Sequence, residues 1–106
     1  MLITTTNDLP GRQVVEVLGE VMGLTVRSRN IGSQFGASLK SLLGGELKGM
    51  TKALVASRHE VVDRMVAEAE EKGADAILAM RFDTSEMGPN WTEICAYGTA
   101  VRTQAV

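Results

Sequence analysis

The stretch from Arg12 to Ser28, RQVVEVLGEVMGLTVRS, constrains the fold more than any other, because it predicts one unusually long strand. Its apolar side chains follow a period of two. One parity holds Val14, Leu18, Met22, Leu24 and Val26, and the other holds Val15, Val17 and Val21. Two partly apolar faces predict a strand that is covered on each side for part of its length.

A helix is the competing interpretation of this stretch. The density of β-branched residues argues against it, because such side chains favour strands. Gly19 and Gly23 lie inside the pattern, and within a strand they indicate a bulge, a bend or a close backbone approach.

The periodicity changes after the long strand and predicts two helices. Apolar residues recur at three- and four-residue intervals over 31–43, with Asn30 as a candidate N-cap and Gly44 and Gly45 as the stop. A second helix is expected over 46–72, with Gly73 closing it.

Strands are predicted on both sides of this helical region. Residues 2–6 (LITTT) form a short one, and residues 74–84 and 91–104 form a hairpin around the turn SEMGPN. In the first arm Leu78, Met80 and Phe82 are expected to share a face. In the second, the small-residue face of Ile94, Ala96, Gly98 and Ala100 is expected to pack against a neighbouring subunit.

The predicted order is therefore β-β-α-α-β-β, in a single α+β domain of residues 1–106 whose antiparallel sheet packs on two helices. The chain is poor in large side chains, since aromatic residues make up 4% of it and eleven positions are glycine. A lone subunit of this composition would be marginally stable. We expect a homo-oligomer, because association buries a second apolar face.

The charge balance, 11 basic and 13 acidic residues without a basic stripe, argues against a nucleic-acid partner. No stretch approaches the roughly 20 apolar residues that span a bilayer, and the N-terminus lacks the pattern of a signal peptide. A single cysteine fits a reducing compartment. We expect a cytoplasmic protein with no membrane partner.

The candidate metal ligands are Cys95 and His59, the sole cysteine and histidine. Zinc and softer metals need several ligands, so one chain would have to add carboxylates or methionines, whereas a site on a symmetry axis could take one ligand from each subunit. A Cys95 nucleophile would need His59 as its base. We expect instead that His59 is exposed on its helix and that Cys95 is buried as a small apolar side chain. The sequence contains no catalytic constellation.

Three further features favour structural interpretations. The segment GGE at 44–46 could bind an anion through backbone N–H groups, but a helix–helix corner needs the same residues, and Glu46 would repel an anion. Gly98 interrupts a strand, which predicts the close approach of another backbone or side chain. Arg58 and Arg64 are expected to form ion pairs within the helix or between subunits.

Four segments jointly resemble the YbjQ-type family of small bacterial proteins, which carries a heavy-metal-binding label. They are LGEVMGLTV (18–26), SLLGGE (41–46), ASRHEVVDRMVAEAEEKGADAI (56–77) and AYGTAV (96–101), and they cover nearly the whole chain in the family order. The resemblance implies an α+β subunit akin to the dodecin-like fold, assembled into a ring-shaped homopentamer. It implies heavy-metal binding and no established reaction.

Two classes of function follow, with an enzyme a distant third. The protein is a binding protein for a metal or small ligand, with its site between subunits or in the ring, or it is a structural or regulatory oligomer without a ligand. For metal, Cys95 ranks first because thiolate is the softest donor in the chain, and His59 ranks second.

Overall fold

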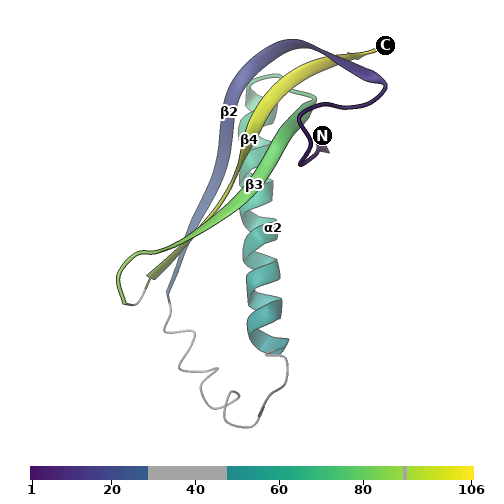
Figure 1. Ribbon diagram of the computed structural model, residues 1–106. Coiled ribbons are helices and arrows are strands. Elements are labelled where there is room, and N and C mark those ends of the chain that lie inside the picture. Colours follow the sequence, from purple (N-terminus) through teal and green to yellow (C-terminus); the bar gives the residue numbers. More distant parts are fainter. Residues whose placement is uncertain (29–47, 90) are drawn as a thin grey trace.

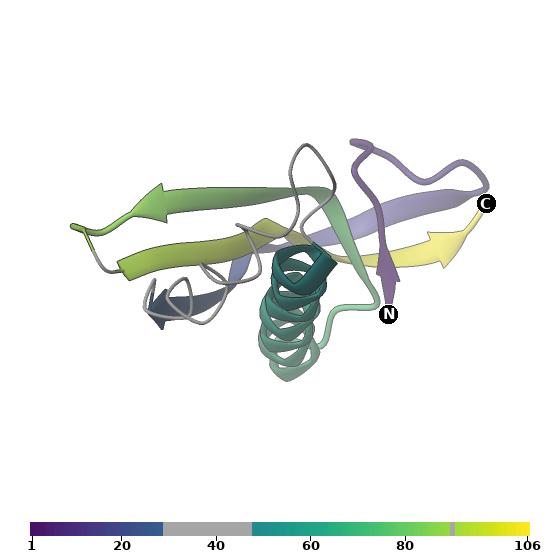
Figure 2. The same cartoon turned by 90° about the horizontal axis from the view of Figure 1, so that it is seen from below.

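A four-stranded sheet and one helix make up the described part of the protein, residues 1–28, 48–89 and 91–106 of a computed structural model. The elements are β1 (Leu2–Ile3), β2 (Arg12–Ser28), α2 (Lys48–Glu71), β3 (Ala76–Glu86) and β4 (Trp91–Ala105). The strands lie in the order β1-β3-β4-β2. α2 lies along one face of this sheet (Figures 1 and 2).

The long strand predicted from the period of two is confirmed, because β2 runs from Arg12 to Ser28. The second predicted helix is also confirmed and begins at Lys48. The first predicted helix, over 31–43, and the GGE corner at 44–46 lie outside the described residues, which contain one helix. No helix in the described ranges is long and apolar enough to cross a membrane.

The prediction of an antiparallel sheet was wrong at one edge. β2 and β3 each pair antiparallel with β4, but β1 pairs parallel with β3 through Leu2 and Ile3. The long crossover through β2 and α2 brings the chain back beside β1 in the same direction, and only a long connection can join parallel strands.

The end of α2 follows the predicted glycine stop. Gly73 has a φ of +81°, which suits a residue without a side chain. Its N–H donates to the Glu70 carbonyl and the Ala74 N–H donates to the Ala69 carbonyl, both at 3.0 Å. This is the Schellman pattern, which satisfies the last helix carbonyls and turns the chain toward β3.

Small residues allow α2 to approach the sheet closely. The helix presents Val61, Met65 and Ala69, all fully buried, to the buried residues Val21, Ile77, Met80, Ile94, Ala96 and Ala100 of the sheet. At Gly23 a Cβ atom would lie 1.8 Å from the Val61 carbonyl oxygen, so the two backbones are in contact there. Gly23 is therefore the close approach that the sequence indicated.

The expectation that the small-residue face of β4 packs against a neighbouring subunit was wrong, because α2 covers this face within the chain. Ala96 and Ala100 are fully buried there. The close approach predicted at Gly98 is confirmed, but it comes from β3: a Cβ would lie 2.6 Å from Ile77 Cγ2 and 3.0 Å from the Leu78 carbonyl oxygen.

A bulge in β3 corrects the predicted alternation of that strand. The register with β4 shifts between Leu78 and Arg81, and Ala79 has a φ of +54°. The extra residue places Leu78 on the face opposite to Met80 and Phe82. Leu78 packs with Ala76, Val101 and Leu9 in a second small cluster, where the segment between β1 and β2 covers the sheet.

Gly23 and Gly73 are required for different reasons, one for lack of space for a side chain and the other for its backbone conformation. Gly23 has no positive φ but no room for a Cβ, whereas Gly73 has a positive φ and nothing within 4 Å of a Cβ. We expect Gly23→Ala to lower the free energy of unfolding by about 3 kcal/mol or more, because α2 must move away from β2. Gly73→Ala is expected to cost about 1 kcal/mol in backbone strain. Urea unfolding of both variants measures this, and equal losses would contradict the close packing at Gly23.

Candidate functional site on the outer face of the sheet

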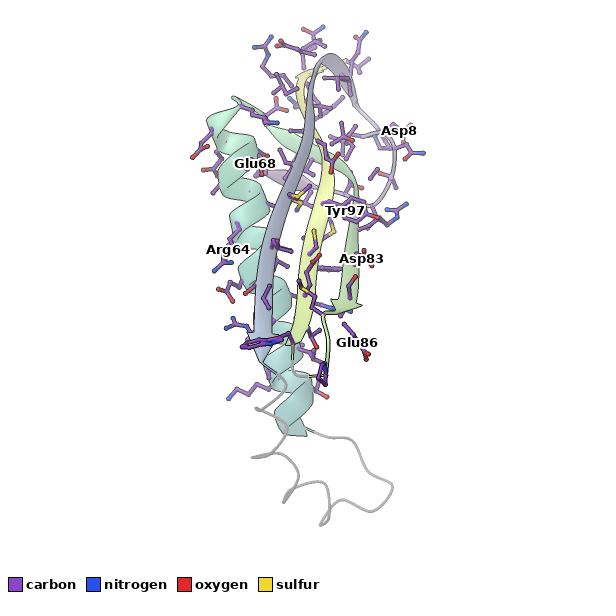
Figure 3. The ribbon with its side chains drawn as sticks, turned by 90° about the vertical axis from the view of Figure 1, so that its left-hand side faces the viewer. Asp8, Arg64, Glu68, Asp83, Glu86 and Tyr97 are labelled. Carbon is purple, nitrogen blue, oxygen red and sulfur yellow. The ribbon has the colours of Figure 1, made fainter. Side chains whose placement is uncertain are left out.

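The face of the sheet opposite α2 is called the outer face here. Gly23 contacts α2 and pairs with Ala96, so both lie on the helix side. Successive strand residues point to opposite sides. The next pair, Leu24 with Cys95, therefore belongs to the outer face, as does the pair Met22 with Tyr97. Figure 3 shows Tyr97 projecting away from α2.

The outer face carries a group of large apolar side chains exposed to solvent. Met22, Leu24, Val26, Trp91 and Tyr97, called the outer patch, are each between 38% and 51% exposed. Monomeric proteins seldom leave a contiguous apolar patch of several large residues open. The sequence indicates this patch, since Met22, Leu24 and Val26 share one parity of β2, whereas the predicted partner surface lay on the opposite face, on β4.

Cys95 lies inside the outer patch. Its Cα partners are Leu24 on β2 and Asp83 on β3. It is only 9% exposed, so its predicted burial is confirmed. The thiol sulfur lies 3.7 Å from the carbonyl oxygen of Ala96, to which it can donate a weak hydrogen bond.

The surroundings of Cys95 disfavour the thiolate. Burial raises its pKa above the ordinary value of 9.0, and the negative charges of Glu93, Asp83 and Glu20 raise the pKa further. A thiol is nucleophilic and binds metal in its thiolate form. Cys95 is therefore a protonated, unreactive side chain at neutral pH.

His59 lies on the other side of the molecule from Cys95. It is exposed on α2, as predicted. Val61, two residues later, is fully buried against the sheet. Two residues turn a helix by about 200°, so His59 points away from the sheet. One chain therefore does not bring His59 and Cys95 together.

The donor set of one chain does not fit a heavy-metal site. Across residues 1–28, 48–89 and 91–106, no group of three or more His, Cys, Asp or Glu side chains is placed to hold an ion. Asp83 and Glu93 act on Cys95 through their charges, but a closed zinc site needs four ligands. Additional donors would have to come from a second copy.

Comparison with known proteins places this chain among relatives of nearly the same length. Residues 1–104 match the YbjQ family, whose description is "Putative heavy-metal-binding". The chain belongs to this family. A UPF0145 protein of Acidothermus cellulolyticus is 67% identical over 96% of this chain and 94% of its own. A UPF0145 protein of Mycobacteroides abscessus is 55% identical over 100% of this chain and 99% of its own.

The family extends beyond bacteria. A UPF0145 protein of the archaeon Sulfurisphaera tokodaii is 46% identical over 95% of this chain and 89% of its own, so the expectation of a bacterial family was too narrow. Among solved structures, a protein of unknown function from Pediococcus pentosaceus, of the DUF74 family, has a TM-score of 0.51 at 16% identity. The match covers 98% of each chain. This likeness supports the α+β fold and gives no evidence about function.

The raised pKa of Cys95 predicts a specific alkaline sensitivity. A thiol whose folded pKa lies above its unfolded value favours the folded state while it is protonated. That contribution is complete below the unfolded pKa and is lost as pH rises through the folded pKa. We expect stability to fall above pH 9.0, the ordinary thiol pKa, more steeply in the wild type than in Cys95→Ala. Urea unfolding at a series of pH values measures this, and parallel curves would contradict the buried, charge-perturbed thiol.

Proposed function

We propose that this protein is the subunit of a homo-oligomer in which the outer patch of each copy is covered by another copy. The observation that carries the proposal is the bare apolar outer face, opposite a face that α2 has already covered. Its apolar residues are half exposed, with Trp91 at 51% and Leu24 at 43%.

The shape of the subunit supports the same conclusion. Its radius of gyration is 17.3 Å, and its extents are 55 × 26 × 16 Å. A compact domain of 100 residues has a radius of gyration of about 13 Å. In the described residues, an extended sheet with one helix buries less apolar surface than a compact domain, so covering the outer face would add burial to this part of the chain.

Covering the outer patch gains enough free energy to contribute substantially to association. Burying a large apolar side chain completely is worth about 1.5–3 kcal/mol, so covering the exposed half is worth about 1 kcal/mol. Five such residues give on the order of 5 kcal/mol for each outer patch that a neighbouring copy covers, within the entropic cost of association of about 4–15 kcal/mol. Further contacts are needed for tight assembly.

A second copy suits this patch better than a different protein. Charges of both signs border it, with Asp83 and Glu93 on one hand and Arg81 on the other, and mixed charges can be arranged to complement one another between copies. A ring-shaped homopentamer, implied by the family resemblance, is the assembly we propose.

Replacing one apolar residue of the outer patch by a charge tests the interface. We expect Leu24→Glu to shift the protein toward monomer, because the interface would have to bury an unpaired carboxylate. Leu54→Glu is the matched control, since Leu54 is 49% exposed on α2, away from the outer patch. Native mass spectrometry and light scattering at micromolar concentration measure both. A monomeric wild type, or a Leu24→Glu variant that assembles normally, would contradict the proposal.

Heavy-metal binding between copies is the second candidate function. It is supported by the family description and by the position of Cys95 within the outer patch. Assembly through this patch would bring Cys95 of one copy toward the donor groups of another, with Asp83 and Glu93 as nearby carboxylates. Because the thiol must lose its proton to bind metal, its raised pKa predicts weak affinity at neutral pH that increases as pH rises.

Metal titration tests this candidate directly. Calorimetry with Zn²⁺, Cd²⁺ and Cu⁺ compares the wild type with Cys95→Ser, which we expect to keep the fold at a cost of at most about 2 kcal/mol. A site between neighbouring copies of the ring predicts binding in the wild type, at one ion per chain, that is lost in the variant. His59→Gln is the control for the second donor. Equal weak binding by all three proteins would leave Cys95 a packing residue of the sheet.

A further inference from the structure

The outer edge of β2 is occupied by side chains of α2. β2 is the last strand of the sheet, so its open side faces no other strand in the part of the chain that the structure describes. Lys72 Nζ donates to the Glu20 carbonyl at 3.0 Å, Glu68 Oε2 accepts from the Met22 N–H at 3.3 Å, and Arg64 Nη1 donates to the Leu24 carbonyl at 2.5 Å. Such edge groups would otherwise be a template for another strand.

The spacing of helix and strand makes this arrangement repeat. Glu60, Arg64 and Glu68 of α2 and Lys72, the residue directly after α2, are called the charge ladder. They recur every four residues, or about 6 Å along the helix axis. The bonded backbone groups recur every two residues of β2, or about 6.6–6.8 Å. The two steps differ by less than about 1 Å, so flexible side chains stay in register over three contacts. Figure 3 shows α2 beside β2 and labels Arg64 and Glu68.

The signs of the charges match the groups that they meet. The two cations, Arg64 and Lys72, bond carbonyls, and the carboxylate of Glu68 bonds an N–H. Glu60 completes the charge ladder, because it accepts from Arg64 at 2.7 Å and also pairs with Arg27 of β2. The ion pair predicted within the helix at Arg64 is thus confirmed, whereas Arg58 lies over the Phe82 ring instead, 4.8 Å from its centre.

Stability alone does not account for these contacts. The side chains of the charge ladder are 32–52% exposed. Exposed ion pairs of this kind contribute about 0–1 kcal/mol each. Occupying the edge, however, removes the hydrogen-bonding groups that an incoming strand needs, whatever the net energy of each contact.

The opposite edge of the sheet, formed in part by β3, identifies the strand of a second copy that could add to the β2 edge. The N-terminal segment bonds β3 as far as the Met80 N–H, which donates to the Thr4 carbonyl. Within the described residues, the backbone hydrogen bonds between this segment and β3 extend no further. A second copy therefore presents the part of β3 after Met80 as an extended edge. Joining β3 of one copy to β2 of the next would be a head-to-tail contact, which extends into a filament unless its rotation closes a ring.

We propose that the charge ladder locks the β2 edge against the addition of β3 from a second copy of this chain, and so prevents open-ended growth of the sheet. The charge ladder blocks the edge of β2, whereas assembly through the outer patch uses the outer face of the sheet. The inference therefore stands whether or not the outer patch is an interface.

Removing the lock has two measurable consequences. In Glu68→Leu we expect the edge amide of Met22 to exchange with solvent at least about tenfold faster than in the wild type, by NMR. Lys72→Met, which frees the Glu20 carbonyl and keeps the bond at Met22, is tested by assembly size alone. We also expect species larger than the wild-type assembly in sedimentation velocity, increasing with concentration. Glu68→Gln keeps an acceptor oxygen and is expected to behave as the wild type.

Glu70→Leu is the control for added apolar surface and lost charge, because Glu70 is exposed two residues further along α2 and points away from β2. Two results would contradict the proposal that the charge ladder blocks strand addition at β2. One is faster exchange of the Met22 amide without larger species, and the other is larger species that Glu70→Leu forms equally well. Unchanged exchange at Met22 would show that the Glu68 contact does not hold the edge. Lys72→Met keeps the test decisive if Glu68→Leu fails to fold, since it leaves the carboxylate in place.

Discussion

The contact between the backbones of β2 and α2 at Gly23 determines how the rest of the protein is arranged. Because Gly23 has no side chain, the helix lies directly against the strand at Val61. Small residues on β4, such as Ala96, extend this close packing across the sheet. The helix therefore covers the side of the sheet where Gly23 and the alanines of β4 allow close approach, and it leaves the side chains of the outer patch on the other side.

Two properties of the molecule follow from this choice of face. The outer patch, with Met22 and Leu24 on β2 and Tyr97 on β4, has no covering element within the described chain. The helix is also close enough to the outermost strand for Arg64, Glu68 and Lys72 to reach its backbone. Within the described residues, one helix thus buries one face and occupies one edge, which leaves the outer patch exposed.

The candidate ligands show where reasoning from sequence was sufficient and where it was not. The burial of Cys95 and the exposure of His59 followed from residue type and helix context, and both are confirmed. Their positions on opposite sides of the molecule depend on which face of the sheet the helix covers. Burial is the largest cause of the raised pKa of Cys95, followed by nearby negative charges. One of these, Asp83, is twelve residues away in sequence and reaches the cysteine through strand pairing.

The sequence by itself determined the extent of β2 and the stop of α2 at Gly73, because periodicity and glycine conformation are local properties. It also determined that Gly98 needs a close neighbour. Only the tertiary structure decided that the neighbour is β3 of the same chain, that β1 runs parallel to β3, and that the bulge at Ala79 turns Leu78 to the outer face. Those outcomes depend on register and on the face that the helix occupies. A period of two specifies that a strand has two faces but carries no information about which one is covered.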